Sequence, residues 1–421
     1  MSLVRTSFWN GIAVAVRVGA GLVLNKILAV YVGPAGYATM GQFQNAMSVA
    51  MTFATGAVST GVTKITAEHF DDAERQRALW RTAGTVVIGA ALISAAFIVA
   101  FRRPLARTML NDEALSGTFI WLAASLTFIS LNALLLAIFN GKKDVRRYVV
   151  SNIAGSILAL GVIGALTWRY GLYGALVALS VYQGVTFFVT VQQALSAPWF
   201  SLRCLVGPID RAHLKSLGHF MVMAATSAAA VPLSQTLIRQ HLGTEIGWDF
   251  AGYWDAMWRI STIYLTLVTT TLTLYWLPRI AEIRTWPELR AEIWQTYRLV
   301  LPLVIMAAVG LFLARDIVIQ LLFTPKFAQM RELFAWQLAG DVVKIASWIV
   351  AFVMVGKGLT KTFVMTEIAA AVMFVGYTVI FVRFTGFNGV SIAHFSTYLS
   401  YLLLVSALTL STERRRAALF R

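Results

Sequence analysis

Long apolar stretches dominate the chain and alternate with short polar segments. Each stretch has about 20 residues or more, the length that an α-helix needs to cross the hydrocarbon core of a bilayer. The pattern predicts twelve such helices, at about 8–32, 38–62, 82–101, 116–140, 148–168, 172–194, 216–240, 250–277, 296–314, 333–356, 361–382 and 387–411. The fold class predicted is therefore an all-α integral membrane protein with twelve transmembrane helices.

Short sequence matches recur at a nearly constant interval of about half the chain, as internal duplications do. Residues 35–37 and 251–253 both read Ala-Gly-Tyr, and a Gly-Lys pair follows at 141–142 and again at 356–357. A Gly-x-x-Gly motif occupies 171–174 and 386–389. We predict two parallel six-helix repeats, residues 1–205 and 206–421, around a central lumen, with the proline-containing segment 196–210 as the linker.

The basic residues determine the predicted topology. Of the 421 residues, 58% are hydrophobic and 13% charged, against about 25% charged in soluble domains. With both termini in the cytoplasm, most Lys and Arg residues outside the spans fall on the cytoplasmic side, although the cluster at 102–107 does not. This positive-inside bias accounts for much of the +16 net charge without a nucleic-acid partner.

Two predicted helices carry polar stripes. In the stretch 247–273, Asp255 and Arg259 lie one helical turn apart, and threonines at 262, 266, 269 or 270, and 273 continue the same face. Such a face is expected to line a polar cavity, although a single buried ion pair joining two helices is the simpler alternative. The second helix, its repeat partner, carries Gln42 and Asn45 on a similar stripe of amides and hydroxyls, which suits a sugar.

Charged residues within or at the mouth of the spans are the candidate functional groups. Five are basic and three are acidic: Arg17, Lys26, Arg259, Arg298 and Lys344, with Asp255, Asp341 and Glu367. Each costs at least about 2.5–3.5 kcal/mol at the bilayer centre, so a set with surplus cations indicates a functional cavity. The surplus favours an anionic substrate such as a phosphate.

Individual members of this set have competing interpretations. Arg17, in mid-span without an acid nearby in sequence, is the first candidate for an anion ligand, whereas Lys26 can snorkel to the interface. Arg298 can also be a topology charge, and Asp341 with Lys344 can form an internal pair. Glu367, the acid without a basic neighbour in sequence, is the first candidate for proton coupling, with Asp255 and Asp341 as further ones.

Other classes of site find little support. Cys204 is the single cysteine, so no disulfide framework or thiolate metal site is expected, and the five histidines show no ligand spacing. No cofactor and no catalytic group are predicted.

Several stretches resemble a known family. The opening MSLVRTSFWN followed by GAGLVLNKILAVYVGPAGYA, the run STGVTKITAEH, and above all FTPKFAQMRELFAWQLAGDVVKIASW are similar to the Wzx flippases of the multidrug/oligosaccharidyl-lipid/polysaccharide (MOP) exporter superfamily. Within that family the sequence most resembles the lipid III flippases of enterobacterial common antigen synthesis. The resemblance implies two six-helix bundles around a V-shaped cationic lumen.

The resemblance also implies an activity. Such a protein moves an undecaprenyl-pyrophosphate-linked oligosaccharide from the cytoplasmic to the periplasmic leaflet of the bacterial inner membrane, by alternating access. A polymerase and a chain-length regulator of the same pathway would be candidate partners. The alternatives are a drug or cation antiporter of the same superfamily, whose lumen should be acidic, and a membrane-embedded glycan polymerase or ligase, which should need a large periplasmic loop.

Overall fold

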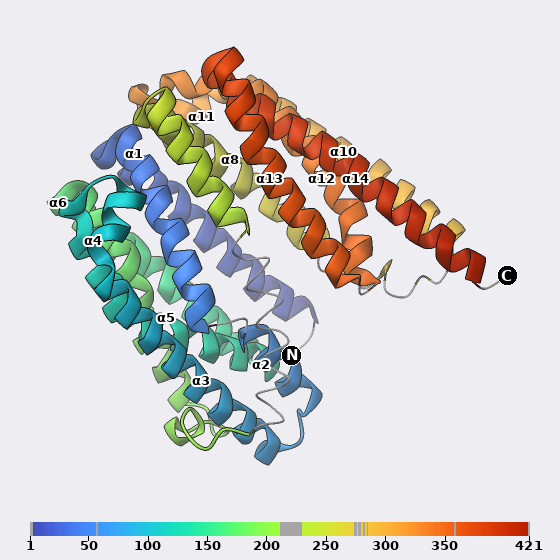
Figure 1. Ribbon diagram of the computed structural model, residues 1–421. Coiled ribbons are helices and arrows are strands. Elements are labelled where there is room, and N and C mark those ends of the chain that lie inside the picture. Colours follow the sequence, from blue (N-terminus) through green and yellow to red (C-terminus); the bar gives the residue numbers. More distant parts are fainter. Residues whose placement is uncertain are drawn as a thin grey trace. The chain divides into compact units, whose positions relative to one another are not determined.

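The computed structural model describes residues 3–55, 58–210, 230–272, 276, 279–280, 283, 285–357 and 359–419. Within these ranges, regular secondary structure is helical throughout (Figure 1). The chain divides into two compact units, Met1–Pro232 and Leu233–Arg421, each with its own buried core.

The N-terminal unit is a bundle of long helices with short connecting turns. Its elements are α1 (Leu3–Thr55), α2 (Val58–Glu68), α3 (Ala73–Ala100), α4 (Arg102–Leu105), a π-helical turn (Ala106–Leu110), a 3₁₀ turn (Glu113–Leu115), α5 (Ser116–Gly141), α6 (Val145–Leu195) and a 3₁₀ turn (Leu202–Cys204). Helix α5 packs against α2, α3 and α6, and α1 packs along α6.

The C-terminal unit repeats this plan. It contains residues 233–245 of a helix over 230–245, followed by α8 (Trp248–Thr271), α10 (Trp286–Leu313), α11 (Arg315–Leu322), a 3₁₀ segment (Pro325–Leu333), α12 (Phe334–Gly356), α13 (Thr360–Thr385), a 3₁₀ turn (Gly386–Asn388) and α14 (Gly389–Leu419). Helix α12 packs against α10 and α14, and α13 packs against α14.

Glycines with positive φ mark corresponding breaks in the two units. Gly33 (φ 70°) and Gly171 (φ 57°) interrupt α1 and α6, while Gly247 (φ 115°) precedes α8 and Gly386 (φ 61°) ends α13. This left-handed region is costly for residues with a Cβ atom. Gly171 and Gly386 are 215 positions apart, and Gly33 and Gly247 are 214 apart, so the interval read from the sequence also spaces the backbone breaks.

The helices are consistent with twelve spans. Seven helical stretches of the described chain are long and apolar enough to cross a membrane. Three of them, of 38, 51 and 49 residues, contain Gly33, Gly171 and Gly386 and have the length for two crossings each. Helix 230–245 and α8 match the two remaining predicted spans, although the first part of the span predicted at 216–240 lies outside the described residues.

The segment predicted as the linker packs onto the N-terminal unit. Gly207 exchanges two hydrogen bonds with the Thr85 side chain of α3, at 3.1 and 3.2 Å, and the Asp210 backbone N–H donates to Thr82 at 3.0 Å. The border between the two compact units falls at Pro232. The repeat border at 205 and 206 remains a prediction.

Candidate functional site: a network of buried charges in the C-terminal unit

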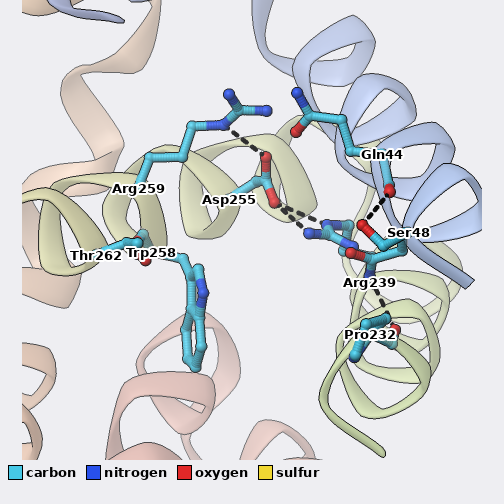
Figure 2. A network of polar contacts seen from close by, with 9 residues as sticks. Gln44, Ser48, Pro232, Arg239, Asp255, Trp258, Arg259 and Thr262 are labelled. Carbon is cyan, nitrogen blue, oxygen red and sulfur yellow. Dashed lines mark hydrogen bonds and ion pairs between the residues drawn. The ribbon is translucent and has the colours of Figure 1, made fainter. Parts of the chain in front are cut away.

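Asp255 on α8 is held by two arginines (Figure 2). Arg239, from helix 230–245, donates to Oδ1 from Nε at 2.8 Å and from Nη2 at 2.5 Å. Arg259, one turn along α8, donates from Nε to Oδ2 at 3.3 Å. Two guanidinium groups facing one carboxylate leave a local formal charge of +1, which favours an anion beside them.

The two arginines differ in burial. Arg239 is 3% exposed and Asp255 2%, so this pair joins helix 230–245 to α8 inside the unit. The guanidinium of Arg239 also lies 5.5 Å from the ring centre of Trp254, a residue that the solvent does not reach. The Arg259 side chain is 21% exposed and has the longer contact. The buried pair expected as an alternative is thus present, and a second, more accessible cation adjoins it.

The threonine stripe continues from this network along α8. Thr262, Thr266 and Thr270 are exposed, and each hydroxyl donates to the backbone carbonyl one turn earlier, at 2.6 to 2.9 Å. Exposure of this face within the unit agrees with the predicted polar stripe. Thr273 lies outside the described residues.

A second group of polar side chains surrounds Asp341 on α12. Asp341 is fully buried, and its Oδ2 accepts a hydrogen bond from the Tyr264 hydroxyl at 2.9 Å. Its Oδ1 lies 3.0 Å from Nε2 of His394 on α14. Within the described part of the chain, Nδ1 of that buried imidazole has no hydrogen-bond partner.

Lys344, one turn beyond Asp341, lies among aromatic rings. Its Nζ is 4.8 Å from the ring centre of Trp258, 5.0 Å from that of Trp348 and 5.1 Å from that of Tyr398. Each contact is within the range of a cation–π interaction, and the residue is 9% exposed. The ammonium group of Lys344 is therefore stabilised by ring faces of three different helices.

Glu367 on α13 is paired with a phenol. The Tyr401 hydroxyl of α14 donates to its Oε1 at 2.6 Å. The carboxylate that stands apart from bases in the sequence thus has a neutral donor in the structure, as does Asp341. Each of the three predicted acids therefore accepts at least one hydrogen bond from a neighbouring side chain.

The formal charges of this C-terminal network balance. Arg239, Arg259 and Lys344 face Asp255, Asp341 and Glu367, three bases against three acids. Arg298 is exposed on α10 and is not a member of the network. Of the cations predicted from the sequence, Arg17 and Lys26 on α1 therefore account for the surplus of formal positive charge.

The predicted residues of the N-terminal unit all belong to α1. Gln42 is fully buried, and Asn45, 7% exposed, donates to the backbone carbonyl of Pro232 at 2.8 Å. Lys26 is half-buried. The backbone of Arg17 is helical, but its side chain lies outside what the structure describes.

Several members of the network were missed from the sequence. Arg239 stands at the end of the span predicted at 216–240 and was not counted among the charges within or at the mouth of the spans. His394 was one of five scattered histidines, and Tyr264 and Tyr401 gave no signal within otherwise apolar spans. The aromatics at 253, 254 and 258 follow helical spacing, which was a detectable signal of a shared face, but only packing of the helices places Trp258 beside Lys344.

The fold is the one found in solved transporters of the MOP superfamily. The structure matches an inward-facing multidrug resistance MATE family transporter of that superfamily with a TM-score of 0.77, covering 94% of this chain and 96% of the other at 16% identity. It also matches the lipid II flippase MurJ in an inward closed conformation, with a TM-score of 0.73, covering 96% and 86% at 13% identity. At these identities the likeness establishes the fold.

The sequence comparisons establish the family. The sequence model of the protein family described as polysaccharide biosynthesis protein matches residues 3–284, so the chain belongs to that family. The lipid III flippase of Escherichia coli (strain K12) is 28% identical over 417 residues, which are 99% of this chain and 100% of the relative. The resemblance inferred from the sequence is confirmed.

Proposed function

We propose that the protein is a flippase that moves an undecaprenyl-pyrophosphate-linked oligosaccharide from the cytoplasmic to the periplasmic leaflet of the bacterial inner membrane. The full-length relative in E. coli is named a lipid III flippase, and a glycan of that type is the first candidate substrate. A multi-pass membrane protein without an enzymatic role fits both the family and the fold. Both termini are expected in the cytoplasm.

One observation carries the choice of an anionic substrate. The three acids of the C-terminal network already hold donors, whereas two arginines share the single carboxylate of Asp255. A cation carrier needs carboxylates open to its substrate, so this arrangement disfavours the drug or cation antiporter. The guanidinium of Arg259, whose side chain is 21% exposed, has the planar geometry that phosphate oxygens accept.

In the proposed site, Arg259 exchanges its contact with Asp255 for one with a phosphate group, and this exchange makes substrate binding reversible. Its one contact with Asp255, at 3.3 Å, is weaker than the two short contacts of Arg239, so a phosphate group can take Arg259 while the buried pair stays intact. The carboxylate then draws Arg259 back when the substrate leaves. Arg17 and Lys26 supply further positive charge on α1. Gln42 and Asn45 are buried in this state, so their amides would reach sugar hydroxyl groups only after the bundle rearranges.

Proton coupling is assigned to Asp341 and Glu367 as a further part of the proposal. Each carboxylate is hydrogen-bonded to groups that can remain bound after it takes up a proton: Tyr264 and His394 for Asp341, and Tyr401 for Glu367. Alternating access of the two units would expose such groups to one side at a time. The polymerase or ligase alternative has no described feature in its favour.

Transport in proteoliposomes tests the function. Fluorescent undecaprenyl-pyrophosphate oligosaccharide would be incorporated with wild type, Arg17→Ala or Arg259→Gln, with and without a proton gradient. Wild type should move the lipid, each variant should be at least tenfold slower, and Arg298→Gln should match wild type. Equal rates in wild type and both variants would refute the cation assignment, and folded wild type that moves no such lipid would refute the flippase.

A further inference from the structure

A polar cavity lies inside the N-terminal unit. It has a volume of about 480 Å³, within the roughly 300–1,000 Å³ typical of small-molecule sites. Its walls come from the first segment of α1, from α5, and from both segments of α6, which Gly171 folds back along each other. The cavity therefore belongs to one compact unit.

The described lining is polar. Among the described residues that line the cavity, none is Asp, Glu, Lys, Arg or His. The hydrogen-bonding groups are three amides, two phenols and a hydroxyl, with Thr186 and Ser156 beside them: Asn132, Asn152, Gln183, Tyr148, Tyr182 and Ser151. These residues offer an ion no counter-charge for its lost hydration, so they suit an uncharged ligand.

Two buried polar atoms at this cavity lack protein partners. Among the described residues, neither Oδ1 of Asn132 nor Oγ of Ser151 has a hydrogen-bond partner, and Ser151 is 1% exposed. Unsatisfied buried groups are rare in native proteins, because each costs on the order of 1–3 kcal/mol. Both atoms belong to residues that line the cavity, so a side-chain rotation that turned them toward a bound hydroxyl group would satisfy them.

Small residues keep the space open. Ala20, Gly21, Gly155 and Ala159 stand on the walls between the polar groups. A Cβ atom built on Gly21 would meet no other atom within 4 Å, so a larger side chain there can enter the cavity without displacing a helix. By contrast, a Cβ on Gly155 would lie 3.0 Å from the methyl group of Thr186.

We infer that this cavity is a binding subsite for one uncharged sugar unit of the transported glycan. The inference rests on the proposed function for its physiological ligand. Amides and hydroxyls supply donors and acceptors to the sugar hydroxyls, and the phenol rings of Tyr148 and Tyr182 offer apolar faces to the pyranose ring. The subsite would recognise a sugar of the lipid-linked glycan, and its pyrophosphate is left to the cationic residues of the proposed function.

A cavity-filling variant separates this inference from the proposed function. Gly21→Leu places a side chain in the cavity, and Gly161→Leu is the matched control, since Gly161 is an exposed helical glycine of the same unit with open space around it. Asn132→Leu is a second variant, which removes an unpartnered atom and so should not weaken the fold. All three would be checked for folding by size-exclusion chromatography and thermal melting in nanodiscs.

The probe is N-acetylglucosamine, with glucuronate as its charged counterpart, observed by saturation-transfer NMR on the full-length protein. Wild type and Gly161→Leu should transfer saturation to N-acetylglucosamine, with signals at least fivefold weaker for Gly21→Leu, for Asn132→Leu, and for glucuronate on wild type. No wild-type signal, or equal signals in folded Gly21→Leu, would overturn the subsite.

Transport is measured in parallel in the same preparations. Wild type that moves the lipid-linked glycan but gives no sugar signal would refute the subsite and leave the flippase intact. Wild type that binds the sugar in a Gly21-dependent way but moves no lipid would support the subsite and refute the flippase.

Discussion

Removal of Arg239 and removal of Arg259 should affect different properties of the protein, stability in the first case and transport in the second. Arg239 is buried and supplies both short contacts to Oδ1, whereas Arg259 is 21% exposed and supplies one contact at 3.3 Å. We expect Arg239→Met to lower the stability of the protein and Arg259→Gln to lower transport with little effect on stability.

The magnitudes follow from burial. Removing one partner of a buried ion pair costs about 3–5 kcal/mol, because the other charge stays in a nonpolar environment. Asp255 retains Arg259 in the Arg239→Met variant, so the lower end, about 3 kcal/mol, is expected. Arg259→Gln leaves the buried pair intact, and partly exposed pairs contribute roughly 0–1 kcal/mol.

Equilibrium unfolding in mixed micelles, followed by tryptophan fluorescence, measures these differences, and the proteoliposome assay measures transport. A double variant, Arg239→Met with Asp255→Leu, provides the control. It leaves no buried unpaired carboxylate, so it should be more stable than Arg239→Met alone.

Two results would refute this reasoning. If Arg259→Gln destabilised the protein as much as Arg239→Met, the carboxylate would be shared equally and Arg259 would not be available to a phosphate. If the double variant were less stable than Arg239→Met, the buried carboxylate would not be the source of the loss.

Three further predictions concern the C-terminal network. Gly340→Ala should destabilise by about 1–3 kcal/mol in the same unfolding assay, because a Cβ there would overlap the His394 ring, whereas Gly376→Ala, with open space, should be neutral or slightly stabilising. Lys344→Met should change stability by less than about 2 kcal/mol, since desolvation of the charge offsets its attraction to three rings; a loss above 3 kcal/mol would contradict this balance. Glu367→Gln should fold but lose the stimulation of transport by a proton gradient, and an unchanged stimulation in proteoliposomes would exclude Glu367 as the coupling group.

The sequence determined the class of protein and the course of the helices. In a bilayer every backbone polar group must be satisfied internally, so a chain of apolar runs of about 20 residues has helices as its main option. The sequence also indicated the duplication. Gly171 and Gly386 are needed where the backbone turns with positive φ, and such positions tolerate few other residues. These features depend on local properties, which a sequence displays directly.

The sequence also identified five of the six charged residues of the network, all except Arg239. Asp255 and Arg259 are one turn apart, so their pairing needed only helical geometry. Asp341 and Lys344 also lie about one helical turn apart. In the structure, however, Asp341 contacts Tyr264 and His394, and Lys344 lies among aromatic rings.

Tertiary structure alone decided the partners of these charges. Arg239 reaches Asp255 from another helix, and His394 is 53 residues from Asp341 in the chain. Such contacts depend on how helices rotate and pack against each other, which the periodicity of a single helix does not specify. For the same reason the sequence did not predict the polar cavity of the N-terminal unit. Its walls combine residues from α1, α5 and α6, and its volume depends on how these helices pack.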